Sequence, residues 1–278
     1  MVLLLGQSCT DYSDYERVGD YRYKVSEIAE LPVELPECSG MTYVGDVLLA
    51  LNDGGNGATI HELDTGTAAL RRSINIENTV NIDWEAMALH EDQLVIGDMG
   101  NNTGTRVSQK LYHLDAASYQ LINVLDYSLP GQVAEPSISH NFDSEALSVI
   151  DDHYYIWTKN RGNDSTYLHV ARVGSAEFAK KGSMSVAGLI TDSYYHQQSG
   201  RHLLLCNELV GESYLSALIV CEVDNKTTDI TKLATVPLAI DDKVEAITWL
   251  KDDTFLIASE STKAGDLGML YSMELVGL

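Results

Sequence analysis

A repeat recurs five times along this chain of 278 residues. Each copy begins with a strand-like segment, and the five segments read ECSGMTYV from Glu37, DWEAMALH from Asp83, DSEALSVI from Asp143, SVAGLITD from Ser185 and KVEAITWL from Lys243. A second and a third apolar segment follow in each copy, separated by turns rich in Gly, Asn and Asp. Short segments punctuated in this way are typical of antiparallel strands joined by tight turns. The repeat therefore predicts an all-β fold of five similar units.

A fourth strand follows each of the first four copies but not the fifth, because the chain ends at Leu278. The unassigned segment YRYKVSEIAEL near the N-terminus can supply the missing strand. Pairing the first strand with the last unit closes a propeller ring and removes exposed sheet edges. We therefore expect residues 19–278 to form a single five-bladed β-propeller of four-stranded antiparallel blades. Six blades is the alternative, if a long insert hides a degenerate blade.

One position of the repeat precedes a Gly or Ala and then an apolar residue. This pattern predicts that five residues occupy equivalent places in successive blades, namely Ser39, Glu85, Glu145, Ala187 and Glu245. The fourth copy departs from the others because it carries Ala where three blades carry Glu.

The N-terminal segment, residues 1–18, is expected to be a tail, or the remnant of an export or lipoprotein signal with its tether. Its apolar run, Val2 to Leu5, is too short to span a membrane. The string LLGQSC followed by a polar, acidic stretch resembles the end of a bacterial lipoprotein signal, in which Cys9 is lipidated. An ordinary cysteine in a frayed tail is the alternative. We expect a periplasmic, cell-surface or extracellular protein.

The other three cysteines are Cys38, Cys206 and Cys221, and their spacing does not match a zinc site. Cys206 and Cys221 lie on consecutive predicted strands. Two interpretations remain open for them: buried free thiols, or a cross-strand disulfide in an oxidising compartment.

The chain is strongly acidic, with 41 Asp and Glu against 18 Lys and Arg, which gives a formal charge of −23. Such a charge opposes binding to phosphate backbones and to anionic lipid. Nucleic acid is therefore excluded as a partner, and membrane contact is expected only through lipidation at Cys9. Cations are the partners that this field attracts.

Acidic residues recur where the first strand of each unit starts and where the second strand ends. In an antiparallel blade these two points lie at the same mouth, so the acids of five blades are expected to meet there. Because Ca²⁺ accepts six to eight oxygen ligands in flexible geometry, it is the cofactor that this cluster favours. The candidate metal ligands are Glu37, Asp83, Glu85, Asp98, Asp143, Glu145 and Glu245. The candidate ligand-binding residues are Asp53, Lys159, Asn160, Arg161, Glu208, Lys243 and Glu260. In the alternative interpretation, the acids accept backbone hydrogen bonds and hold neighbouring blades together.

Several motifs within residues 30–278 resemble those of an exported bacterial propeller group related to SdiA-regulated, TolB-like and phytase/esterase-like propellers. The most specific are NIDWEAMA from Asn81 and GDMGNN from Gly97, and NFDSEAL and YYIWTKN support them. The resemblance implies a propeller that is often exported and sometimes carries calcium.

The function that these features predict is binding of a small molecule, cation or protein ligand at an acidic central mouth. A calcium-dependent phosphoester or glycoside hydrolase is the alternative, with Lys159, Arg161 and Lys243 to hold an anion and Trp84, Trp157 and Tyr43 as sugar platforms. The chain lacks a Gly-x-Ser-x-Gly elbow, a Walker loop and a dinucleotide fingerprint, so a serine hydrolase or a nucleotide enzyme has no sequence support. Asp53, Glu145 and Glu245 are the candidate carboxylates for glycoside cleavage, and the sequence does not assign catalytic residues. A protein-interaction scaffold is the third hypothesis.

Overall fold

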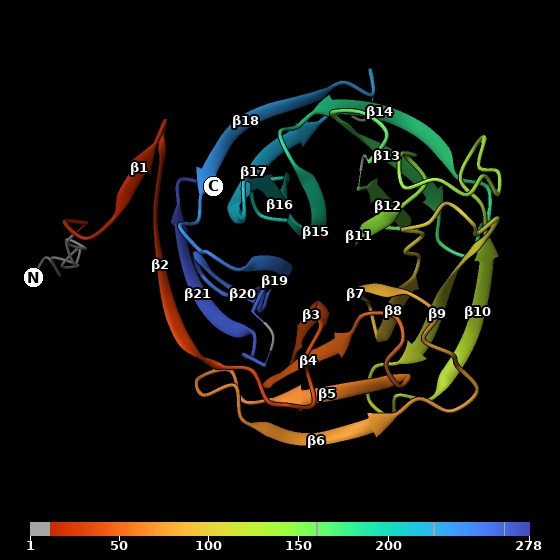
Figure 1. The fold of residues 1–278 in the computed structure, drawn as a ribbon, viewed down its shortest axis with the longest axis horizontal. Helices are drawn as coiled ribbons and strands as arrows, with labels where there is room; N and C mark the ends of the chain where they lie inside the picture. The colour runs from red at the N-terminus through yellow and green to blue at the C-terminus, as the bar shows by residue number, and fades with distance from the viewer. Residues whose placement is uncertain (1–11, 160, 225, 264) are drawn as a thin grey trace, which may run out of the picture.

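Five antiparallel sheets are arranged around a central axis in the computed structural model, which describes residues 12–159, 161–224, 226–263 and 265–278 (Figure 1). The first blade comprises β3 (Cys38–Val44), β4 (Val47–Asn52), β5 (Thr59–Leu63) and β6 (Leu70–Asn75), and the second β7 (Trp84–His90), β8 (Gln93–Asp98), β9 (Gln109–Asp115) and β10 (Leu121–Tyr127). The third comprises β11 (Ser144–Ile150), β12 (His153–Thr158), β13 (Ser165–Arg172) and β14 (Ala179–Ser185), and the fourth β15 (Leu189–His196), β16 (Arg201–Val210), β17 (Ser213–Val223) and β18 (Ile230–Pro237). The fold is a five-bladed β-propeller, as predicted.

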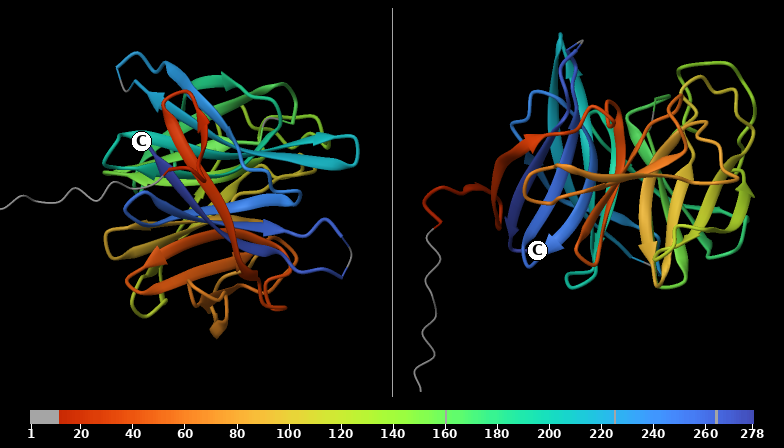
Figure 2. Two further views of the ribbon diagram at one scale, coloured as in Figure 1. Left: turned by 90° about the vertical axis from the view of Figure 1, so that its left-hand side faces the viewer. Right: turned by 90° about the horizontal axis from the view of Figure 1, so that it is seen from below.

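The fifth blade joins both ends of the chain. Its inner strands are β19 (Lys243–Lys251), β20 (Thr254–Glu260) and β21 (Met269–Val276), and its outer strand is β2 (Tyr21–Glu30). β2 runs antiparallel to β21 and lies along the outside of the blade (Figure 2). The predicted closure by the N-terminal strand is therefore confirmed. The short strand β1 (Glu16–Val18) pairs with β2 as a fifth strand, so the sheet extends into the segment expected to be a tail.

The innermost strand of every blade contains a β-bulge near its start. In each case one residue is left without a partner on the second strand, and these residues are Ser39, Glu85, Glu145, Thr191 and Glu245. The bulge defines which positions are equivalent, and four of the five predicted equivalences are correct. The assignment of Ala187 is wrong, because it lies before β15 and Thr191 takes its place.

Apolar residues from facing sheets form the core between neighbouring blades. Trp84, Met87, Leu147 and Ile247 are all buried, as the packing interpretation expected. The second strands of all five blades are buried except at their ends, whereas the outer strands of the first four blades are largely exposed or half-buried. The inner part of each blade is therefore covered by the neighbouring blades, and its outer strand faces solvent.

Polar contacts also connect adjacent blades along the inner ring. Ser39 Oγ donates to Trp84 O at 2.7 Å, and Thr191 Oγ1 makes the same bond to Val244 O at 2.7 Å. Asp192 Oδ2 accepts the backbone N–H of Ile247 at 2.8 Å. The bulged positions therefore serve blade-to-blade bonding wherever they carry a hydroxyl.

The three cysteines beyond residue 11 are buried free thiols, so the disulfide interpretation does not hold. In the β16–β17 ladder Cys221 pairs with His202 and Cys206 pairs with Ala217, which places the two thiols four residues apart in register. Cys9 lies outside the described residues. Within those residues we find no helix able to cross a membrane.

Candidate metal centre at the acidic mouth

The bulges place three glutamates, Glu85, Glu145 and Glu245, on one ring inside the mouth where the innermost strands begin. All three are at most 4% exposed. Asp83 and Asp143 lie two residues before Glu85 and Glu145, just ahead of β7 and β11, and the backbone N–H groups of Met99 and Lys159 donate to their carbonyl oxygens. The antiparallel pairing therefore brings the ends of β8 and β12 to the same mouth, as the sequence predicted.

Four of the predicted metal ligands are paired with basic side chains. Each pair joins one carboxylate to one cation, at 2.9 Å for Asp98 Oδ1 and Arg106 NH1, 2.5 Å for Asp143 Oδ2 and Arg161 Nε, 2.6 Å for Glu145 Oε2 and Lys159 Nζ, and 2.7 Å for Glu245 Oε1 and Lys243 Nζ. Lys243 also contacts Glu260 at 3.0 Å. The structure thus neutralises these acids with the chain's own cations.

Lys159 is the most deeply buried cation of the mouth. Burial alone would lower the pKa of its ammonium group, but Glu145, Glu245 and Glu85 outweigh that effect and raise it. Lys159 therefore remains charged at neutral pH and provides a fixed positive charge to the glutamate ring. Its role in the structure is to balance the ring, with its Nζ already bonded to Glu145.

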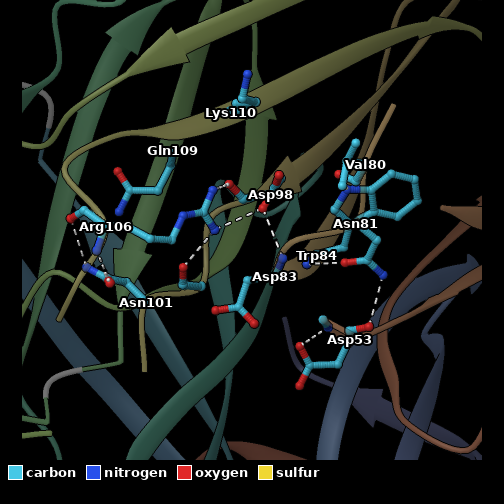
Figure 3. Close-up of polar contacts among 12 residues, drawn as sticks. Asp53, Val80, Asn81, Asp83, Trp84, Asp98, Asn101, Arg106, Gln109 and Lys110 are labelled. Carbon is cyan, nitrogen blue, oxygen red and sulfur yellow. Dashed lines mark hydrogen bonds and ion pairs between the residues drawn. The ribbon is translucent and has the colours of Figure 1, made fainter. Parts of the chain in front are cut away.

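Apart from the exposed Glu37 and from Glu208, which lines a separate cavity, three predicted site carboxylates lack a basic partner within ion-pair distance in the described part of the chain: Asp53, Asp83 and Glu85. One oxygen from each lies within 4.8 Å of the other two. Glu85 Oε1 is buried and has no hydrogen-bond partner in the described part of the chain. In Figure 3 the Asp83 carboxylate lies between Asp53 and the Asp98–Arg106 pair without a drawn contact. We call these three residues the carboxylate triad.

Two glycines make room for the triad. A Cβ atom at Gly100 would overlap Glu85 Oε1 and Asp83 Oδ2, and one at Gly54 would lie 2.6 Å from Asp83 Oδ1. Gly54 belongs to the NDGGNG string and Gly100 to GDMGNN. The backbone of both turns therefore approaches the carboxylates more closely than any other residue would allow.

The triad holds its protons more tightly than isolated carboxylates do. Burial raises the pKa of Glu85 well above its usual range, and Glu145, Asp53 and Asp83 raise it further against the opposing effect of Lys159. Burial, Asp53 and Asp143 raise the pKa of Asp83 to about 7. Burial also raises the pKa of Asp53. Close carboxylates of this kind must share protons or a cation.

Arg106 was missed by the sequence reasoning. It lies on the β8–β9 loop, where NH1 also donates to Gly100 O at 2.9 Å and NH2 donates to Asp98 O at 3.0 Å (Figure 3). The sequence does show an arginine eight residues after the buried Asp98. It does not specify the loop conformation that directs this arginine back to Asp98.

The remaining predicted residues lie at the edge of the mouth or away from it. Glu37 is exposed and accepts a hydrogen bond from Asn56 Nδ2 at 2.7 Å. Glu208 lines a separate cavity of about 440 Å³ in the fourth blade with Cys206 and Tyr214. Asn160 lies outside the described residues.

Comparison with known proteins supports the fold. No established family profile matches the chain, and no curated protein matches its sequence. Among solved structures, an aldose sugar dehydrogenase from Escherichia coli in its apo form has a TM-score of 0.52 at 8% identity, covering 90% of this chain and 99% of its own. The PQQ-bound aldose sugar dehydrogenase of Streptomyces coelicolor has a TM-score of 0.51 at 12% identity, covering 91% and 98%. A protein from Thermus thermophilus described as a glucose dehydrogenase has a TM-score of 0.51 at 10% identity, covering 90% and 99%. At these identities the likeness shows a propeller fold alone.

Proposed function

We propose that this propeller binds a divalent cation, Ca²⁺, through Asp53, Asp83 and Glu85 at its acidic mouth. The observation that carries the proposal is the buried, unpartnered oxygen of Glu85 beside two further carboxylates, all within 4.8 Å of one another. Every other buried acid of the inner ring on blades two, three and five has a basic partner. The triad is the part of the mouth where carboxylates shielded from solvent are left without a basic partner.

Calcium fits the chemistry of the triad. It takes only oxygen ligands, and its flexible coordination accommodates carboxylates together with carbonyl groups and waters. Three carboxylates leave the remaining positions open for a ligand of the mouth. Extracellular calcium modules work with dissociation constants of roughly 10⁻⁴–10⁻³ M, which suits the export to the periplasm or cell surface that we also propose.

Thermal unfolding with and without CaCl₂ tests the proposal. A cation that binds only the folded state stabilises it by RT ln(1 + [L]/Kd), about 2.7 kcal/mol at a hundredfold excess over Kd. We expect Ca²⁺ to raise the melting temperature of the wild type by a few degrees. The double variant Asp83→Asn, Glu85→Gln should be more stable than the wild type without metal and should lose the calcium response.

Glu37→Gln is the matched control, because Glu37 is an exposed acid of the same mouth outside the triad. It should keep the full calcium shift. A wild type that shows no shift, or a double variant that keeps it, would contradict the triad as the site.

No contact of the described residues favours the hydrolase alternative. Lys159, Arg161 and Lys243 would have to hold an anionic substrate, but each is bonded to a carboxylate. Trp84 and Trp157 are fully buried and cannot present a ring to a sugar. A protein ligand at the same mouth remains the third hypothesis.

A further inference from the structure

The ring of blades has a second mouth where the innermost strands end, and a cavity of about 530 Å³ opens there. All five blades contribute to its wall through consecutive residues of β3, β7, β11, β15 and β19. This volume lies in the range of small-molecule sites. The cavity shares no residue with the carboxylate triad, and Tyr43, a candidate sugar platform of the hydrolase alternative, is part of its wall.

The wall of this cavity is aromatic on one side and aliphatic on the other. Counting four residues from each bulge gives the equivalent positions, which are Tyr43, Leu89, Val149, Tyr195 and Trp249. The three aromatic residues belong to the fourth, fifth and first blades, which are neighbours in the ring (Figure 1). They therefore form one continuous sector of the wall, and all three are half-buried.

Contacts with neighbouring residues hold these aromatic residues in place. Trp249 Nε1 donates to Asp252 O at 2.8 Å. The Tyr195 ring lies 5.0 Å from the His202 ring, centroid to centroid. The backbone N–H of Tyr43 donates to Thr248 Oγ1 at 3.2 Å, which ties the first blade to the fifth.

Three hydroxyl groups of the wall are engaged with neighbouring residues. Ser148 Oγ and Ser193 Oγ are hydrogen-bonded at 2.9 Å, and Thr248 Oγ1 already accepts from Tyr43. Asp151 is the one charged residue among the described residues that line the cavity, and no basic residue accompanies it there. Beside the polar side chains of Thr42 and Gln197, the cavity offers a ligand aromatic faces and one carboxylate.

We propose that this second mouth binds a small organic cation with an apolar surface, of the quaternary ammonium class. Aromatic faces attract such cations through their quadrupole, and the attraction grows when the cation loses its water. Asp151 supplies a counter-charge at the rim, and the formal charge of −23 draws cations towards the molecule. An anion would meet no basic group among the described residues that line the cavity, and a neutral polyol lacks the charge that the aromatic faces and Asp151 attract.

Choline and its neutral carbon isostere, dimethylbutanol, provide the test, since they share shape but differ in charge. Of the three tryptophans, Trp84 and Trp157 are fully buried, so acrylamide quenching of fluorescence reports mainly on Trp249. Choline should protect Trp249 from acrylamide, and isothermal titration should give at least about tenfold tighter binding for choline than for dimethylbutanol. Equal binding of the two, or no binding of choline, would overturn the proposal.

Variants locate the site. Trp249→Leu should weaken choline binding about tenfold, while Trp249→Phe keeps a ring and should weaken it less. Because loss of Trp249 removes the fluorescent reporter, these affinities are measured by titration calorimetry on protein with an unchanged circular dichroism spectrum. The double variant Asp83→Asn, Glu85→Gln should bind choline as the wild type does. Loss of binding in that variant would place the cation at the acidic mouth and contradict the assignment, whatever the outcome for calcium.

Discussion

Gly100 determines how closely the carboxylates of Asp83 and Glu85 can approach the β8–β9 loop. Its backbone does not have a positive φ, so the conformation alone would tolerate alanine. The constraint is space, because a Cβ atom there would overlap Glu85 Oε1 and Asp83 Oδ2. Glycine at this position is therefore a requirement of the triad and not of the turn.

Replacing Gly100 by alanine should displace the two carboxylates and weaken calcium binding by about tenfold or more, because a ligand oxygen moved by about an ångström leaves the coordination shell. The fold should persist, since the loop is outside the strands. Calcium titration followed by thermal unfolding measures both effects. Gly66→Ala is the control, since a Cβ there meets its nearest atom at 3.6 Å, and equal calcium responses of the two variants would contradict this account.

At the scale of the elements, alternation and turn residues were enough to predict the strands of four blades. The first strand of the fourth blade was misplaced because its apolar pattern is broken by Asp192 and Ser193. Asp192 is buried, and its carboxylate accepts N–H groups from Ser193 and Ile247. A buried acid satisfied by backbone groups of its own blade and of the next one looks like a turn residue in the sequence, so the pattern places the strand start around Ala187 instead.

The acidic mouth could be predicted from topology, because strand direction alone decides which ends meet. The division of its acids into paired and unpaired ones could not be. That division depends on which carboxylates the side chains of Arg106, Arg161 and Lys243 contact. These side chains come from loops or strand ends, and the repeat does not encode the conformation of those segments. Glu85 and Glu145 have the same place in the repeat, yet only Glu145 has a lysine at ion-pair distance.

Removing the closing strand should abolish cooperative folding. β2 pairs with β21 from Arg22–Val276 to Glu30–Met269, and Tyr21 and Tyr23 contribute buried rings to the core of the fifth blade. Deletion of residues 1–30 should therefore give a broad urea transition and a large loss of stability. Deletion of residues 1–11 is the control and should leave the transition unchanged. A sharp wild-type transition in the longer deletion would show that the ring does not depend on this strand.

At the scale of the whole molecule, buried histidines make the folded state less stable as the pH falls. Burial lowers the pKa of His202 and of His169 to about 4, so both are neutral in the folded state at neutral pH. The unfolded chain takes up these protons at about pH 6.5, so stability is present above that pH and is lost as the pH falls towards 4. The raised pKa values of Asp83 and Glu85 act in the opposite sense.

His202→Phe should reduce the acid sensitivity of the fold by on the order of 2 kcal/mol. Phenylalanine preserves the ring contacts that His202 makes with Tyr155, Trp157 and Tyr195, but it cannot be protonated. The measurement is the free energy of unfolding in urea at about pH 7 and about pH 5 for both proteins. Equal losses between the two pH values would show that His202 does not titrate in this range.

The bulge at the start of each innermost strand leaves one residue free to vary during evolution, while the register of the strand must be kept. Because the bulged residue has no partner in the ladder, the sheet does not select for its identity, and this chain carries serine, threonine and glutamate there. Mutation at these five positions can exchange a blade-to-blade hydroxyl for a carboxylate without altering strand register. Descendants of one propeller could therefore acquire, lose or relocate a binding site from blade to blade while their architecture stays the same.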